Sequence, residues 1–246
     1  MILDDYQKRV DELFTQVKTT QRDNIIAAGK MIADTIDAGG NIYLSDICHS
    51  IEWDVINRGG GPVFYRPFHY KLVVDTKAEE ERPRDRSDMD LDMEGLGEYI
   101  LKASPIRPGD VLFVGSVSGR TKSVVDLAWE AKKMGVKVIA MSSMTYAKSV
   151  DAVHSSGKKL YEFVDLTLDN CAPAAEAMLE VDGIEANFAA ASGIASSFIL
   201  WSVTAVVIEE MQKRGKTPLL LKSANYPGGT DYNNTVAYPH YQKHGW

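Results

Sequence analysis

The stretch "VLFVGSVSGRTKSVVDLAWEAKKMG" (residues 111–135) decides the fold, because it joins an apolar run to an amphipathic pattern through a loop of glycine and hydroxyl residues. The apolar run at 111–114 carries no charge, which is typical of a strand covered on both faces of a sheet. After the loop, apolar residues recur at helical intervals. The stretch therefore predicts one strand, loop and helix of a parallel α/β sheet.

Four short apolar runs with helical patterns between them repeat this plan. The runs are NIYLSD (41–46), DVLFVGS (110–116), VKVIAMSS (136–143) and FVDLTLDN (163–170). Their alternation with helices predicts a parallel sheet covered by helices on both faces. Possible edge strands lie near Val63–Tyr65 and Leu72–Val74, and the spacing of apolar residues over 4–37 predicts two helices ahead of the sheet.

These patterns divide the chain into a helical arm, one α/β domain and a tail. We place the arm at 1–38, the domain at 39–222 with an insertion at about 62–104, and the tail at 223–246. The insertion contains the charge-dense stretch TKAEEERPRDRSDMDLDMEG. It is interpreted either as a solvated surface loop or as a lid from which Arg82, Arg84 or Arg86 reaches an anionic ligand.

Composition and charge exclude several classes of function. The 246 residues are 45% hydrophobic and 25% charged, which suits a globular protein with a sizeable core. A net charge of -7 gives no general attraction to nucleic acid or to an anionic membrane, so neither is an expected partner. Cys48 and Cys171 lack paired spacing, which suits a reducing compartment and argues against a disulfide scaffold or a zinc site. The charged N-terminus has no signal-peptide core, and we expect a cytoplasmic protein without a cofactor.

One apolar stretch raises the alternative of a membrane span. Residues 188–208, FAAASGIASSFILWSVTAVVI, contain no charge and are long enough to cross a bilayer. The stretch is rich in Ala, Ser and Gly, stands alone in the chain and is bounded by Glu185 and Glu209. We therefore favour a helix buried in the core or at a subunit interface, where small residues permit close packing.

Polar residues end all four predicted strands. The ends are Ser45-Asp46, Gly115-Ser116, Ser142-Ser143 and Asp169-Asn170. Open parallel sheets bind ligands beyond the carboxyl ends of their strands, so this pattern predicts a small polar ligand at that edge. The alternative is that turns by themselves require polar residues.

The loop GSVSGRT has the chemistry of an anion cradle. Its glycines, Gly119 among them, let the backbone approach an anion, while Ser116, Ser118 and Thr121 offer hydroxyl donors at the N-terminus of the following helix. It has neither the Gly-Lys-Ser/Thr of a Walker A loop nor the Gly-x-Gly-x-x-Gly of a dinucleotide site. The alternative is that Ser118 or Thr121 is only a helix N-cap.

The S-x-S-G-x-T loop resembles that of the sugar isomerase, or SIS, domain, whose members bind phosphosugars through these hydroxyls. The stretches IRPGDVLFVGSVSGRT, AKSVDAVHSSGKKLYEFVDLTLDNCAP and KSANYPGGTDYNN make the chain similar, from about residue 20 to 235, to a bacterial family of SIS-domain phosphosugar-binding proteins. The resemblance implies a three-layer α/β/α sandwich with a five-stranded parallel sheet wound as in flavodoxin. It also implies homodimers or homotetramers with sites near the interface. Phosphate contacts are implied for Ser116, Ser118 and Thr121, with Ser142 and Ser143 beside them.

Two stretches depart from the SIS pattern. Relatives have a Gly-Thr-Gly-His-Ser loop after the first strand, where this chain has Asp46-Ile47-Cys48-His49-Ser50. Without both glycines a ligand approaches this backbone less closely, and Asp46 either repels a phosphate or accepts hydrogen bonds from sugar hydroxyls. The isomerase domain of glucosamine-6-phosphate synthase has a lysine before its last long helix, where this chain has Ser192-Gly193. Its Schiff-base chemistry is therefore not expected. Ser50 and Asn170 complete the expected binding residues.

Isomerisation between an aldose and a ketose needs a positioned base, commonly a carboxylate, and often a His or hydroxyl that opens the sugar ring. Glu52 as base and His49 are the first candidates, because a spacing of three at a helix start places them on one face toward the crevice. The alternatives are a packed His and a Glu that favours the helix dipole.

Further catalytic candidates lie later in the chain. The resemblance implies an acidic residue at the start of a helix, which matches Glu94, and His154 lies in a loop that could reach a partner's site. His69, His240 and His244 have no companions in the sequence that suggest a metal.

Two classes of function follow from the resemblance. One is a phosphosugar isomerase or a related lyase, since SGRT is similar to the same loop of the etherase that cleaves N-acetylmuramic acid 6-phosphate. The other is a non-catalytic phosphosugar-binding or sensing protein, because SIS domains serve both purposes.

Overall fold

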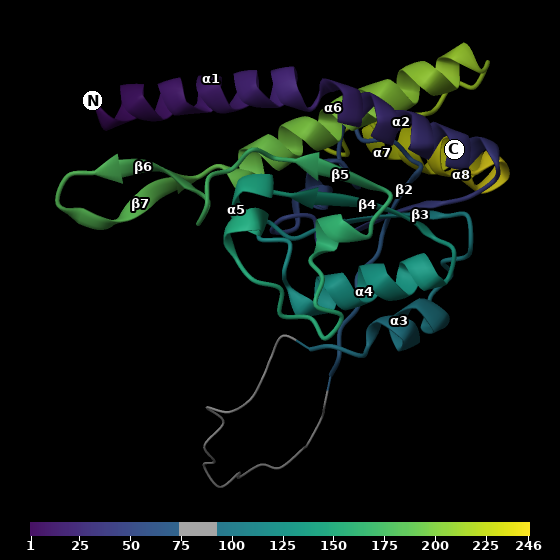
Figure 1. Ribbon diagram of the computed structural model, residues 1–246. Helices are drawn as coiled ribbons and strands as arrows, with labels where there is room; N and C mark the ends of the chain where they lie inside the picture. The colour runs from purple at the N-terminus through teal and green to yellow at the C-terminus, as the bar shows by residue number, and fades with distance from the viewer. Residues whose placement is uncertain (74–92) are drawn as a thin grey trace, which may run out of the picture.

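A five-stranded parallel sheet forms the centre of the computed structural model, which describes residues 1–73 and 93–246. Its strands are β1 (Ile42–Ser45), β2 (Tyr65–Pro67), β3 (Val111–Gly115), β4 (Lys137–Ser142) and β5 (Leu166–Asp169). They lie in the order β2-β1-β3-β4-β5, the flavodoxin-like winding (Figure 1). The four predicted strands are confirmed, and the edge strand lies two residues beyond its predicted place.

The second predicted edge strand, Leu72–Val74, is wrong for the two residues that the structure describes. Leu72 and Val73 are exposed and lie outside any strand. An apolar pair with β-propensity forms no strand when no neighbouring strand edge pairs with it, which is why tertiary context overrides propensity here. Val74 lies outside the described residues, as do Arg82, Arg84 and Arg86.

Helices cover both faces of the sheet. One face is covered by α2 (Arg22–Asp37) and α6 (Ser192–Lys213), and the other by α3 (Gly97–Ala103) and α4 (Lys122–Lys133) (Figure 1). The strands are apolar on both sides, and successive side chains alternate between the faces. In β3, Val111 and Phe113 therefore belong to the core under α2 and α6, whereas Leu112 and Val114 belong to the core under α3 and α4.

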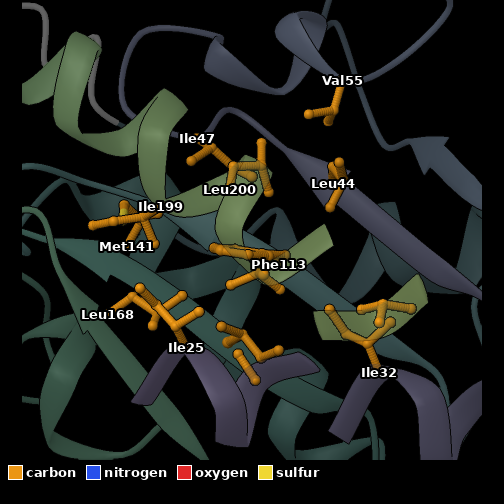
Figure 2. Packing of buried hydrophobic residues seen from close by; sticks show 14 of the residues in the cluster. Ile25, Ile32, Leu44, Ile47, Val55, Phe113, Met141, Leu168, Ile199 and Leu200 are labelled. Atoms are coloured by element: carbon orange, nitrogen blue, oxygen red, sulfur yellow. The ribbon is translucent and has the colours of Figure 1, made fainter. Parts of the chain in front are cut away.

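The larger core fixes the strands whose carboxyl ends carry the site. Figure 2 shows Phe113 and Met141 of the sheet packed with Ile25 and Ile32 of α2 and with Ile199 of α6. Each such side chain is enclosed, and its burial contributes about 1.5–3 kcal/mol to the free energy of unfolding.

The long apolar helix is confirmed as part of the core, but its predicted bounds of 188–208 are wrong. Residues up to Ala190 belong to a strand, and Ala189 has a φ of 68°, which an α-helix cannot continue through. The helix α6 starts at Ser192 instead. A Cβ at Gly29 of α2 would lie 2.4 Å from Val206, so that glycine permits the close approach of α2 and α6. By length and composition α6 would also suit a membrane span, and 44% of its most apolar 18-residue window is buried inside the protein.

An arm projects from the sandwich beside a hairpin that the sequence patterns did not predict. The projecting part of the arm is helix α1 (Ile2–Thr20). The hairpin joins β6 (Ala177–Val181) to β7 (Ile184–Ala190) in antiparallel register (Figure 1). The ring centroids of Tyr6 and Phe188 lie 6.4 Å apart, so the arm and the hairpin are in contact. The two helices predicted over 4–37 are confirmed as α1 and α2, while the domain boundaries stay a prediction.

Short elements complete the described chain. They are η1 (Ile51–Asp54), α5 (Met144–Ser149), η2 (Leu160–Glu162), α7 (Gly229–Tyr232), η3 (Asn233–Ala237) and α8 (Tyr238–His244). The C-terminal helices pack beside β2, where the Arg66 guanidinium lies 3.3 Å from the centre of the Tyr241 ring. Their position leaves the carboxyl ends of the central strands to the loops after β1, β3, β4 and β5.

Candidate functional site

The candidate site is the edge of the sheet at the carboxyl ends of β1 and β3, which we call the crevice because the winding predicts one there. The chain crosses from β1 to the edge strand β2 and then returns to the other side of β1 as β3, so the winding reverses between β1 and β3. Loops separate at such a point, and ligands of open α/β sheets bind there. The predicted residues at the ends of the central strands are therefore placed around one crevice.

The β3 loop brings the predicted phosphate residues together. The hydroxyls of Ser116 and Thr121 lie 2.9 Å apart, and Gly119 has a φ of 64°, the left-handed conformation that glycine adopts without strain. Thr121 stands at the N-cap position of α4, but its side chain makes no capping hydrogen bond. The N-cap alternative is therefore wrong for the Thr121 hydroxyl, and its contact with a phosphate stays a prediction.

The end of β4 lies under this loop. Ser142 is fully buried, its Oγ has no hydrogen-bond partner, and a Cβ at Gly119 would lie 3.7 Å from that oxygen. Ser143 is differently engaged, because its Oγ donates to the Ala172 carbonyl at 2.6 Å and accepts from the backbone N–H of Tyr146. Ser142 is thus enclosed beneath the loop and its contact with a ligand stays a prediction, whereas Ser143 serves to cap α5.

Asn170, at the end of β5, joins the sheet to α6. Its side-chain amide donates to Ser196 Oγ at 3.2 Å, and its carbonyl oxygen accepts from the Ala172 N–H. Cys48 lies beside it, and burial raises the pKa of that thiol to about 12, which keeps it protonated at neutral pH. Because a protonated thiol is a poor nucleophile, Cys48 is not expected to act as one. The contact of Asn170 with a ligand stays a prediction.

The β1 loop holds a left-handed backbone without glycine. Asp46, Cys48, His49 and Ser50 have φ values of 40°, 41°, 71° and 64°. Each such residue costs about 1–2 kcal/mol, and strain of this kind gathers at functional sites. Gly115 at the end of β3 permits the two loops to meet, since a Cβ there would lie 2.8 Å from the Cys48 nitrogen.

His49 and Glu52 do not share a face, so the predicted pairing is wrong. His49 is exposed, and its Nε2 lies 3.3 Å from Glu176 Oε2, whereas Glu52 is fully buried in η1. The reason is local: η1 is a single 3-10 turn that begins after Ser50, so His49 precedes the helix. Burial raises the pKa of Glu52.

Glu52 instead faces His69, a residue for which the sequence offered no companions. Glu52 Oε2 accepts a hydrogen bond from the Ile47 N–H at 2.9 Å, while Oε1 lies 3.6 Å from His69 Nε2. On the other side of the imidazole, Nδ1 lies 3.8 Å from Asp46 Oδ1. We call these three residues the β1-side cluster. Only the edge strand β2, which runs alongside β1, brings His69 next to the loop, so the linear sequence gave no signal for it.

Glu94 and His154 are brought together on the other side of the crevice. His154 Nε2 lies 3.5 Å from Glu94 Oε1 and 3.7 Å from Asp126 Oδ1, and we call these three residues the β3-side cluster. The imidazole is buried, which contradicts the expectation that His154 reaches a partner's site. Hydrogen bonds from Ser155 lower the pKa of Glu94, so its carboxylate is ionised at neutral pH.

The β3-side cluster adjoins the anion cradle. The Leu160 N–H donates to the Gly119 carbonyl at 2.8 Å and ties the loop of His154 to the β3 loop. Lys122, which follows Thr121, attracts the Glu94 carboxylate. These contacts place an acid–base pair beside the N-terminus of α4.

A cleft of about 700 Å³ opens where α6 begins. Its lining includes the apolar side chains of Phe14 and Trp201 and the polar side chains of His49 and Glu176. Ser192 donates a hydrogen bond to Glu176 Oε2 at 2.7 Å. It lies in the stretch that corresponds to the lysine turn of the glucosamine-6-phosphate synthase isomerase domain. The predicted phosphate contacts Ser116, Ser118 and Thr121 do not line this cleft.

Comparison with known proteins identifies the family. The sequence model of the SIS domain matches residues 5–143, more than half of the chain. The chain belongs to the SIS domain family. A UPF0309 protein of Shouchella clausii is 31% identical over 97% of this chain and 96% of its own, and one of Streptomyces griseus is 33% identical over 91% and 89%.

A solved structure agrees on the fold of this SIS-domain protein. The phosphoheptose isomerase of Neisseria gonorrhoeae superimposes with a TM-score of 0.55 over 85% of this chain and 97% of its own, at 13% identity. An identity this low carries the architecture alone. The resemblance expected from the SxSGxT loop and the predicted three-layer α/β/α sandwich are both confirmed.

Proposed function

We propose that this SIS-domain protein binds a phosphosugar and acts on it as an isomerase or a related lyase through a carboxylate base. One observation carries the binding: the paired hydroxyls of Ser116 and Thr121 at the N-terminus of α4, above the unpartnered Ser142 hydroxyl. Hydroxyl donors, a left-handed glycine and a helix N-terminus together suit a phosphate. The similarity in fold to the phosphoheptose isomerase of Neisseria gonorrhoeae supports the reaction class.

We assign the proton transfer to Glu94 and His154. A carbon base has to reach the substrate in its ionised form, and Glu94 keeps 28% of its side chain exposed while Glu52 is enclosed. His154 is buried, and its Nε2 lies 3.5 Å from Glu94 Oε1 without a hydrogen-bond partner among the described residues, so we assign to it the exchange of a proton with Glu94. An enediolate mechanism needs no more than these two groups and a bound phosphosugar.

A panel of hexose, heptose and amino-sugar phosphates tests this proposal. Thermal shift in the presence of EDTA selects a ligand, and proton exchange at the carbon beside the carbonyl is then followed in deuterated water. We expect Glu94→Gln to abolish exchange and retain binding, a loss confined to the transition state. Glu98→Gln is the matched control, because Glu98 is exposed on the next helix and pairs with Lys102. Exchange that persists in Glu94→Gln contradicts the assignment.

The alternative is a protein that binds or senses a phosphosugar without turning it over. Two observations favour it: Glu52 is enclosed, and both oxygens of Glu94 accept hydrogen bonds from the Ser155 N–H, at 3.2 and 3.1 Å. Binding without any proton exchange in the wild-type protein would establish this alternative.

We further propose that the protein is a homodimer or homotetramer. The arm and hairpin carry apolar side chains that are more than half exposed, namely Ile2, Leu3, Ile184 and Phe188. Exposed apolar groups gathered on a projecting element are typical of an interface. Light scattering at micromolar concentration tests this, and a monomer would contradict it.

A further inference from the structure

We propose that Asp46, Glu52 and His69, the β1-side cluster, bind a divalent transition cation such as Zn²⁺ or Mn²⁺. One nitrogen of the imidazole and one oxygen of each carboxylate lie within 4.8 Å of one another. Imidazole and carboxylate donors suit these cations. Three protein ligands also leave coordination positions open for water or for an oxygen of a substrate.

The enclosed carboxylate of Glu52 is the observation that points to a ligand. Its side chain is 0% exposed, yet Oε1 has no hydrogen-bond partner in the described part of the chain and faces the other two residues. A buried anionic oxygen without a donor or a cation is costly. Among residues 1–73 and 93–246, the only donor to this carboxylate from outside its own turn is the Ile47 N–H, which binds Oε2. A cation in the cluster would satisfy Oε1.

The imidazole of His69 does not meet that need. Its nitrogens stand 3.6 Å from Glu52 Oε1 and 3.8 Å from Asp46 Oδ1, both beyond hydrogen-bond length. A cation about 2.0–2.2 Å from each donor holds the donors about 3–3.5 Å from one another, whereas the three ligand atoms lie up to 4.8 Å apart, so the side chains have to close by roughly 1.5 Å. Since the two nitrogens face different carboxylates, a cation binds one of them and draws the carboxylate beside the other toward it.

The surroundings of the cluster hold the ligands and leave an entry path. His69 stacks on the Trp53 indole with ring centroids 5.0 Å apart and an angle of 11°, which fixes the plane of the imidazole. Asp46 is 57% exposed, so the cluster opens to solvent on that side. A fixed ligand, an enclosed ligand and an exposed one form a site that a cation enters from the crevice.

The inference goes beyond the proposed function, since cation binding needs no phosphosugar. The cluster lies on the β1 side of the crevice, and the phosphate cradle lies on the β3 side. In this arrangement Glu52 is a ligand, and proton transfer remains with Glu94 and His154. The two proposals therefore fail independently.

Calorimetric titration of the full chain with Zn²⁺, and separately with Mn²⁺, tests the site after EDTA treatment and gel filtration. All variants carry His244→Asn, because the rings of His240 and His244 lie 4.6 Å apart and form a second candidate pair for zinc. We expect one cation per chain, weakened by about tenfold or more in Asp46→Asn and in His69→Gln, since even indirect ligand supports contribute about 10–100-fold. His49→Ala, which changes an exposed histidine of the same loop, should bind as the parent does.

The possible results distinguish failure of the cation site from failure of the proposed function. Glu52→Gln should also lose the cation, and if it fails to fold, Asp46→Asn and His69→Gln decide the matter because those side chains are partly exposed. Absence of binding at about 1 mM cation, or binding that survives both of those variants, overturns the site. Phosphosugar binding in EDTA is then unaffected, whereas a protein that binds Zn²⁺ but no phosphosugar overturns the proposed function alone.

Discussion

Each side of the crevice carries a histidine between two carboxylates, but the carboxylates are satisfied differently. In the β3-side cluster, Asp126 Oδ2 accepts hydrogen bonds from the N–H groups of Gly95 and Gly97 at 3.0 and 2.7 Å. Glu94 there accepts hydrogen bonds from Ser155. In the β1-side cluster, Glu52 Oε1 has no hydrogen-bond partner among the residues that the structure describes. Backbone donors therefore stabilise the carboxylates on the β3 side, whereas the β1 side lacks such a donor for Glu52 Oε1.

The two loops differ in the same sense. The β3 loop places glycine where its backbone is left-handed, and its hydroxyls face a helix N-terminus. The β1 loop holds four residues with a Cβ in left-handed conformations and ends beside an enclosed acid. The difference indicates that the backbone of the β3 loop is relaxed and its groups suit an anion. The backbone of the β1 loop is strained, and the groups beside it suit a cation or a proton.

The largest expected effect concerns the anion side. Replacing Ser118 and Thr121 together by Ala should weaken phosphosugar binding by about tenfold or more per hydroxyl, because hydrogen bonds to charged groups contribute about 1.5–3 kcal/mol each. Calorimetry with the phosphosugar and the unphosphorylated sugar measures this, and the weak affinity for the latter should stay nearly unchanged. Equal losses for both ligands would break the comparison.

The next effect concerns the contact between the loops. Gly115→Ala should lower the free energy of unfolding by about 1–3 kcal/mol, because the new Cβ would lie 2.8 Å from the Cys48 nitrogen and 2.9 Å from Ile47 Cα. Urea denaturation measures the change. Gly193→Ala is the control, since its nearest neighbour, Ile51 Cδ1, would lie 3.7 Å away. Equal stability of the two variants would show that the loops do not meet as described.

A smaller effect of opposite sign is expected from the strained loop. Ser50→Gly should raise the free energy of unfolding by about 0.5–1 kcal/mol, because relief of a left-handed residue outweighs the extra flexibility of the unfolded chain. Ser50→Ala keeps the Cβ and should leave the strain in place. The same denaturation experiment compares them, and a destabilised Ser50→Gly would argue against strain in the β1 loop.

The smallest effect is a pH dependence on the β3 side. The pKa of Glu94 is lowered in the folded protein, so its carboxylate stabilises the fold above the unfolded pKa of about 4.5 and loses this contribution as pH falls through the folded value. The stability difference between wild type and Glu94→Gln should therefore be larger at pH 7 than at pH 3. Denaturation at the two pH values checks this, and a difference that grows on acidification would reverse the assignment.

The fold and the anion side could be predicted from the sequence because their signals are local. The apolar run before Ser116 and the hydroxyls up to Thr121 fit within one strand, loop and helix. The β1 side could not be predicted for two reasons. The first is that His69 lies beside Glu52 only because β2 pairs with β1. The second is that the residue types of Asp46 and Ser50 do not by themselves predict a left-handed backbone. The prediction for His49 was wrong because it assumed helical spacing, whereas His49 precedes a single 3-10 turn.

The amide resonances of the protein test the central claim most directly, that the β3 loop holds the phosphate. Backbone N–H groups at residues 118–122 lie in that loop and at the start of α4, so a bound phosphate should shift their signals in two-dimensional ¹H–¹⁵N spectra. We predict the largest shifts there with the phosphosugar and none of comparable size with the unphosphorylated sugar. Shifts centred on the β1 loop or on the cleft beside α6, with residues 118–122 unmoved, would contradict the claim.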